Sequence, residues 1–283
     1  MAGDTSTGSG SGNGLYPYKP SQVAAIIALG LFGISAIIHL INMIRKRTWF
    51  YTPLTVGAIM MSAGYLARVF SIKSPDTLII YIMQSLFIIL PPSLYAATIY
   101  MIYGRMVLFV GVREASIIRP NWVTKVFVSG DVLAFLLQAG GGGMMAQAGS
   151  ADLGQKVILV GLFVQLIMFG FFFIVSIVFW RRVRATSAYY TTPQTGKYSW
   201  EALLKLMMAA AVIIILRCVF RMIEFGQGHG GYLVSHEVFM YIFDAVPMLI
   251  VQVMFHFYHA GDVFPQNAVH RKGSESYINM DER

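Results

Sequence analysis

The chain has 283 residues, of which 57% are hydrophobic and only 12% are charged. Soluble domains carry about a quarter charged residues, so this composition excludes an ordinary soluble domain. The net charge of +8 could indicate nucleic-acid binding. The basic residues fall mainly in alternate loops, however, as they do in membrane proteins, and we expect no nucleic-acid partner. The one cysteine, Cys218, excludes an intramolecular disulfide.

Long apolar runs recur along the chain, each near the ~20 residues that cross a bilayer. They predict an all-α polytopic membrane protein, a bundle of seven transmembrane helices. A Gly/Ser-rich segment at residues 1–21 precedes the bundle, and we expect it to be a flexible extracellular tail. The bundle spans residues 22–258, and a cytoplasmic tail follows at 259–283. In chain order, the predicted spans are 22–44, 50–71, 77–103, 121–146, 156–180, 203–223 and 236–258.

Two predicted spans contain residues that disturb a helix. Pro91 and Pro92 should kink the third span near its middle. Such a kink frees backbone carbonyls, which protein or water must then satisfy. The fourth span contains four consecutive glycines, from Gly140 to Gly143. These glycines indicate either close helix packing through small residues or an unwound segment that lines a cavity.

The distribution of Lys and Arg between the spans predicts the orientation. Thirteen lie in the loops after spans one, three and five and in the C-terminal tail, whereas only Lys19, Lys73 and Lys156 lie on the other side. The positive-inside rule therefore predicts an external N-terminus and a cytoplasmic C-terminus. No ATPase domain is recognisable, so movement of a substrate against its gradient would need an ion gradient or a partner.

Polar residues within the spans fall mostly in the predicted outer half of the membrane, and the cytoplasmic halves are nearly all apolar. A charged side chain near the bilayer centre costs a few kcal/mol or more unless it is paired or hydrated, so such residues are candidates for function. Our candidate substrate-binding residues are Arg68, Gln84, Asp131, Gln138, Arg217, Arg221, Glu224, Glu237, Tyr241 and Asp244.

Helical spacing places these charges in two stripes. Arg217, Arg221 and Glu224 share one face of span six, and Glu237, Tyr241 and Asp244 have the same spacing on span seven. We expect one of the two arginines to pair with Asp244 or Glu237, and we expect Asp131 and Arg68 to join the network. Two interpretations stay open. The network can simply fix helix register, or it can line a polar cavity that binds a headgroup, with the glycine-rich loop at 224–232 as its lid.

These residues resemble the fungal lipid-translocating exporter family, also called RTA-like. The resemblance covers about residues 15–265 and combines several motifs. They are Gly64-Tyr65 with Arg68; Gln84 with Pro91, Ala96-Ala97 and Tyr100; Gly104-Arg105; Asp131 with Gln138; Gly161 with Gln165; Arg217, Phe220-Arg221 and Glu224; Gly230-Gly231-Tyr232-Leu233; and His236-Glu237, Tyr241, Asp244 and Pro247-Met248.

The resemblance implies a seven-span plasma-membrane protein that exports amphipathic lipids or lipid-like toxicants. The family is linked to sphingoid long-chain bases, to sterol-like amines such as aminocholesterol, and to porphyrins, and its members confer resistance to stress. Membrane lipids and an amphipathic small molecule are therefore the expected partners. We expect no enzymatic activity, no cofactor and no metal, and the oligomeric state is left open. A seven-span receptor and an intramembrane enzyme with paired carboxylates remain alternatives.

Overall fold

The structure is a computed structural model in which Tyr18 and residues 20–74, 77–145, 147, 149–186, 199–228 and 231–264 are described. It confirms an all-α architecture with seven helices long and apolar enough to cross a membrane. The spans consist of α1 (Gln22–Arg45), α2 (Thr52–Lys73) preceded by a 3-10 turn (Trp49–Tyr51), α3 (Leu78–Ile89) with α4 (Pro91–Val110), α5 (Pro120–Met145), α6 (Ala151–Arg184), α8 (Trp200–Gln227), and α9 (Glu237–Met240) with η3 (Tyr241–Ala245) and α10 (Val246–Phe257).

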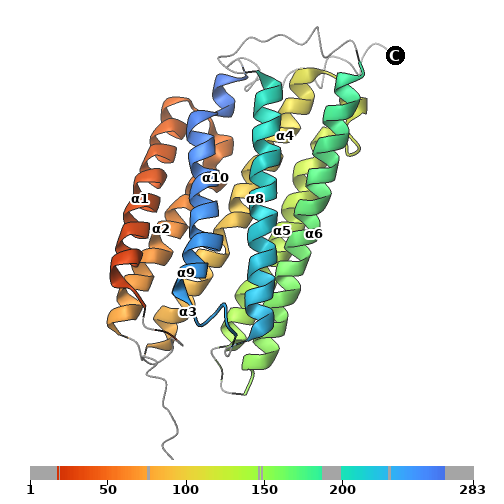
Figure 1. The fold of residues 1–283 in the computed structure, drawn as a ribbon. Coiled ribbons are helices and arrows are strands. Elements are labelled where there is room, and N and C mark those ends of the chain that lie inside the picture. The colour runs from red at the N-terminus through yellow and green to blue at the C-terminus, as the bar shows by residue number, and fades with distance from the viewer. Residues whose placement is uncertain are drawn as a thin grey trace, which may run out of the picture.

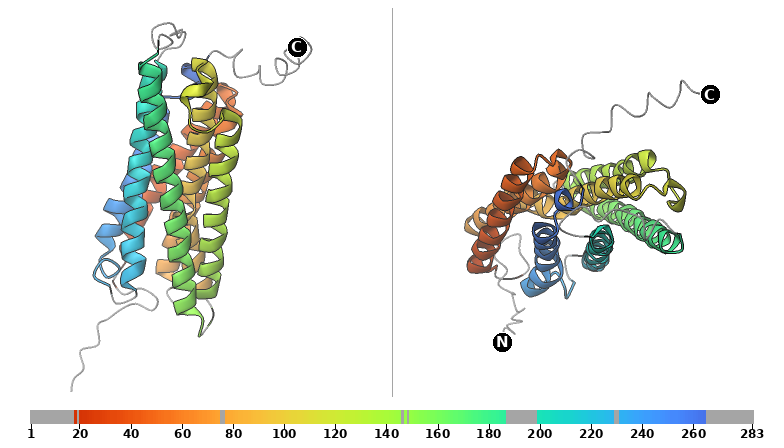
Figure 2. Two further views of the ribbon diagram at one scale, coloured as in Figure 1. Left: turned by 90° about the vertical axis from the view of Figure 1, so that its right-hand side faces the viewer. Right: turned by 90° about the horizontal axis from the view of Figure 1, so that it is seen from above.

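The bundle closes through contacts between its first and last helices. The helices α1 and α10 pack together, α10 packs on α8, and α8 packs on α6. In the end-on view of Figure 2, α1 and α6 lie at opposite sides of the molecule, with α10 and α8 between them. The start of α1 and the end of α10 lie at opposite ends of the bundle, as an odd number of spans requires (Figure 1). We call the end where α1 and α9 begin the outer end, after the orientation predicted from charge.

The third span is broken at its two prolines, as predicted. The helix α3 ends at Ile89, and α4 begins at Pro91, so Leu90 lies at the junction. Span seven contains a second irregularity, which we did not predict. Residues Tyr241–Ala245 form a π-helical turn just before Pro247. Proline cannot donate a backbone hydrogen bond, and π-turns often lie at functional sites.

Two of the four glycines of α5, Gly141 and Gly142, serve helix packing. Residues Gly140–Gly143 lie within the continuous helix α5, so the segment is not unwound. A Cβ atom on Gly141 would lie 2.6 Å from the carbonyl oxygen of Gly154 in α6. The backbones of α5 and α6 therefore approach each other closely here, as small residues permit in membrane helices.

The half of the bundle opposite the outer end, which we predicted to be cytoplasmic, is less apolar than predicted. The rings of His39 in α1 and His256 in α10 stack with centroids 3.9 Å apart. Ser35 contacts both His256 and Gln252, and Gln252 donates a hydrogen bond of 2.6 Å to the Tyr95 hydroxyl. Our expectation of apolar inner halves was wrong, because hydrogen bonds among Ser35, Gln252 and Tyr95 across α1, α4 and α10 offset part of the cost of burying polar side chains here.

Most residues of the two predicted tails lie outside the described part of the chain, so the division into tails and bundle stays a prediction. Residues 259–264, which we placed in the C-terminal tail, pack against the bundle. The Ala260 amide donates to the Tyr51 hydroxyl at 2.8 Å, and Lys46 forms an ion pair with Asp262 at 2.7 Å.

Candidate functional site

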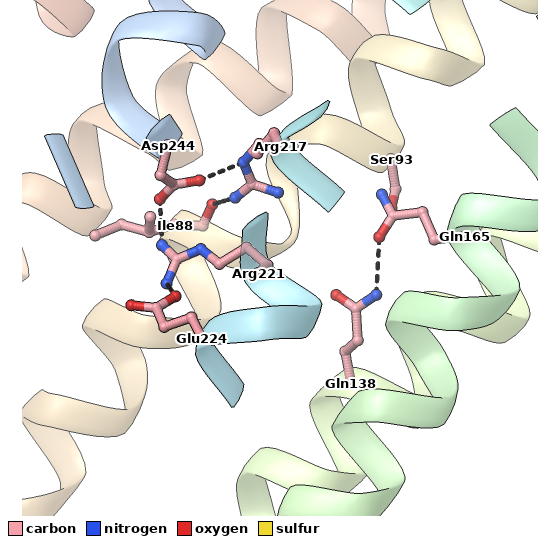
Figure 3. Close-up of polar contacts among 8 residues, drawn as sticks. All are labelled: Ile88, Ser93, Gln138, Gln165, Arg217, Arg221, Glu224 and Asp244. Carbon is pink, nitrogen blue, oxygen red and sulfur yellow. Dashed lines mark hydrogen bonds and ion pairs between the residues drawn. The ribbon is translucent and has the colours of Figure 1, made fainter. Parts of the chain in front are cut away.

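Asp244 holds two arginines at the centre of the bundle. One carboxylate oxygen pairs with Arg217 and the other with Arg221, both from α8 (Figure 3). The side chains of Arg217 and Asp244 are fully buried. The prediction that a span-six arginine pairs with Asp244 or Glu237 is therefore confirmed, with Asp244 as the acid and both arginines bound to it. Two arginines against one carboxylate leave an excess positive charge, which needs further acceptors.

The break in the third span supplies one of these acceptors. Pro92 has no N–H, so the carbonyl of Ile88, four residues earlier, lacks its helical donor. The Arg217 guanidinium donates to this carbonyl instead, with Nη2 lying 2.8 Å from the oxygen (Figure 3). The kink and the charge network are thus one feature, in which the proline frees an acceptor and the arginine uses it.

Glu224 supplies the other acceptor. Its carboxylate lies 2.7 Å from Nη1 of Arg221, one turn earlier on α8. The i, i+4, i+7 stripe that the sequence predicts on this helix therefore forms a connected network in which Arg221 bridges Asp244 and Glu224. This network runs from the buried centre toward the outer end of the bundle.

A second ion pair lies beside the first. Arg68 of α2 contacts Glu237 at 2.7 Å and the Tyr18 hydroxyl at 2.9 Å. The other oxygen of Glu237 accepts a hydrogen bond of 2.7 Å from the Ser21 amide at the start of α1. Glu237 therefore joins α9 to α1 and α2, while Asp244 joins η3 to α8. The π-turn between them explains why the two acids of span seven face different arginines, although their spacing predicts one face.

A pocket of about 330 Å³ opens between these two ion pairs at the outer end of the bundle. Five of the predicted site residues line it, namely Arg68, Gln84, Arg221, Glu224 and Glu237. Much of the remaining wall is apolar, from α3, α5, α6 and the end of α8. The other predicted residues, Asp131, Gln138, Arg217, Tyr241 and Asp244, are not among the lining residues. The volume lies at the small end of the range for ligand pockets.

Several lining residues were missed from the sequence: Tyr18, Tyr81, Ser85, Gln155 and His236. Gln155 lies just before our predicted fifth span, but α6 begins four residues earlier, at Ala151. Its amide donates to the carbonyl of Phe225 at the end of α8. The signal in the sequence that could have identified Gln155 was the position of its side-chain amide, one residue before an apolar run. The predicted lid contributes Gly228 to the wall, followed by Leu233 and Val234, whereas residues 229 and 230 lie outside the described chain.

Two predicted residues lie deeper, on α5. Gln138 donates to Gln165 of α6 at 2.9 Å, and Gln165 donates to Ser93 of α4 at 3.1 Å, which ties three helices together. Asp131 does not join the arginine network, contrary to our expectation. In the described chain, no ion pair involves its carboxylate, and its two oxygens have no hydrogen-bond partner.

Comparison with known protein families gives a match to most of the chain. The RTA1-like protein family matches residues 54–267, a range that contains all ten predicted site residues. The chain belongs to the RTA1-like protein family. No solved structure matches this chain.

Three yeast relatives from Saccharomyces cerevisiae illustrate the family. Protoporphyrin uptake protein 1 is 36% identical over 87% of this chain and 91% of its own length. Protein RTM1 is 33% identical, over 87% of this chain and 92% of its own length. Sphingoid long-chain base transporter RSB1 is 23% identical, over 89% of this chain and 74% of its own length. Two of these names refer to movement of an amphipathic molecule.

Proposed function

We propose that this multi-pass membrane protein moves amphipathic lipids or lipid-like molecules toward the outer leaflet of the plasma membrane. The observation that carries the proposal is the outer-end pocket, which combines two ion pairs with an apolar wall. Such a pocket suits a molecule with a polar headgroup and an apolar body. Two relatives named for a sphingoid long-chain base and for protoporphyrin support this class of substrate.

The ion pairs provide binding sites for either a cationic or an anionic headgroup. An amine can replace Arg68 at the Glu237 carboxylate, or Arg221 at that of Glu224. A carboxylate or phosphate can instead bind the arginines, whose planar guanidinium groups suit both anions. In either case the substrate headgroup takes the place of one member of an ion pair, and the displaced group must find another partner or water.

The broken helices supply elements that can change packing. Arg217 bridges the Leu90 junction to η3 through Ile88 and Asp244. A headgroup that draws Arg221 away from Asp244 therefore changes contacts at both helix breaks. Discrete repacking of such elements is a common basis for switching between states.

The geometry supports transport better than acid–base catalysis. A general acid or base needs a group that is free to exchange a proton with its substrate. Both carboxylates that line the pocket are paired with arginine, at 2.7 Å each. The receptor alternative predicts ligand binding without lipid movement, and the following experiment distinguishes it.

The test uses purified protein in liposomes with a fluorescent long-chain base and a fluorescent phospholipid. We expect faster transbilayer movement of the base than in protein-free liposomes, and loss of this acceleration in Glu237→Gln. Lys205→Gln is the matched control, because Lys205 lies at the other end of the bundle, 56% exposed. A folded wild type that binds the base without moving it would contradict transport and favour a receptor.

A further inference from the structure

Asp131 is a buried carboxylate that the pocket and its ion pairs do not use. It lies near the middle of α5, 3% exposed, and neither of its oxygens has a hydrogen-bond partner in the described chain. The hydroxyl of Tyr100 in α4 is its neighbouring polar group. That hydroxyl is also fully buried and lacks a hydrogen-bond partner among the described residues.

Among the described residues, no cationic side chain forms an ion pair with Asp131. Besides Tyr100 from α4, the fully buried thiol of Cys218 in α8 lies within electrostatic reach. The aromatic rings of Phe127, Phe169 and Phe172 surround Tyr100. The preceding residue on α8, Arg217, is already bound to Asp244 and to the Ile88 carbonyl.

Asp131 thus differs from the other acids in the outer half of the spans. Glu237, Asp244 and Glu224 each contact an arginine. An ionised carboxylate without a partner is far too costly in a low-dielectric interior, whereas a carboxylic acid is tolerated. In the arrangement described here, Asp131 must therefore carry a proton.

We propose that Asp131 is a proton-binding site that couples substrate movement to a proton gradient. This inference rests on the proposed transport function. When the proton leaves, the carboxylate becomes an anion and attracts Arg217, the neighbour of Cys218 on α8, whose Nη1 has no hydrogen-bond partner within the described residues. Withdrawal of Arg217 weakens its contact with Asp244 and changes the packing of η3 against α8. Asp131 takes up a proton from the acidic side and releases it to the alkaline side, while one cationic base moves in the opposite direction, so one cycle transfers no net charge.

The first test needs no variant. A fluorescent long-chain base with a quaternary trimethylammonium headgroup is added to liposomes that contain the protein and a trapped pH-sensitive dye. The fixed charge prevents the base from following a pH gradient by itself. We expect movement of the base to change the lumenal pH in liposomes with protein and not in liposomes without it. Movement of the base with no lumenal pH change would overturn the coupling.

The second test compares Asp131→Asn with wild type. One pH unit supplies up to about tenfold accumulation per coupled proton. Wild type should approach this accumulation, whereas Asp131→Asn, which imitates the protonated acid, should retain movement down a gradient but lose the response to pH. Asp152→Asn, at an exposed carboxylate in the first turn of α6, is the control.

The outcomes separate the two claims. If wild type moves no base under any gradient, the proposed function fails. If wild type moves the base but Asp131→Asn responds to pH as wild type does, only the role of Asp131 fails. Because Asp131 makes no ion pair, its replacement by Asn should leave the fold intact. If that variant does not fold, the lumenal pH measurement on wild type still decides whether movement is coupled to protons, and its failure overturns the proposal.

Discussion

At the scale of single residues, Asp244 is the centre of the site because it is the acid that the two arginines of α8, Arg217 and Arg221, share. Breaking a buried ion pair leaves a charge without compensation, which destabilises a protein far more than loss of an exposed pair. The arrangement therefore makes the stability of the whole bundle sensitive to one carboxylate.

We expect Asp244→Asn to lower the free energy of unfolding by about 3–5 kcal/mol, because Arg217 and Arg221 stay buried without their shared acid. Lys205→Gln removes the exposed member of an ion pair with half-buried Glu201 and should cost less than about 1 kcal/mol. Unfolding in detergent micelles, followed by circular dichroism, compares the two variants. Equal losses would show that the central network adds no more than a surface pair.

At the scale of elements, the break between α3 and α4 links helix geometry to charge. Pro92→Ala restores a backbone N–H that can bind the Ile88 carbonyl, in competition with Arg217. We expect a fold at least as stable as wild type and a severalfold slower transbilayer movement in the liposome assay. Pro53→Ala, in the first turn of α2, is the control, because an N–H at that position has no helical acceptor. If Pro92→Ala moves the base across the bilayer as fast as wild type does, the kink is not needed for function.

The contact between α5 and α6 gives a second prediction for elements. Gly141→Ala places a Cβ atom 2.6 Å from the Gly154 carbonyl oxygen and should cost about 1–3 kcal/mol. Gly140→Ala meets no atom within 4 Å and should be neutral or stabilise the helix by up to ~1 kcal/mol. The melting temperatures of the two variants in detergent test this difference. If the melting temperature of Gly141→Ala equals or exceeds that of Gly140→Ala, the two helices can move apart at this contact without loss of stability.

At the scale of the whole molecule, apolar runs were sufficient to predict seven helices, because each span must satisfy its own backbone in lipid. Spacing also predicted the stripe of Arg217, Arg221 and Glu224. It could not predict the π-turn at 241–245, which turns Glu237 toward α2 and leaves Asp244 facing α8. Nor could it show that Asp131 stands apart, because that depends on which helices are neighbours. The inner cluster of His39 and His256 was missed for the same reason.

The central claim is that the outer-end pocket holds the headgroup of an amphipathic substrate. The most direct measurement is photo-crosslinking in liposomes with a long-chain base that carries a diazirine next to its amine, followed by peptide mapping. We predict labelling of residues 78–89 and 221–240, which excess unlabelled base suppresses and Glu237→Gln weakens. Labelling spread over the lipid-facing helices, or confined to the inner end and unaffected by competitor, would contradict the account.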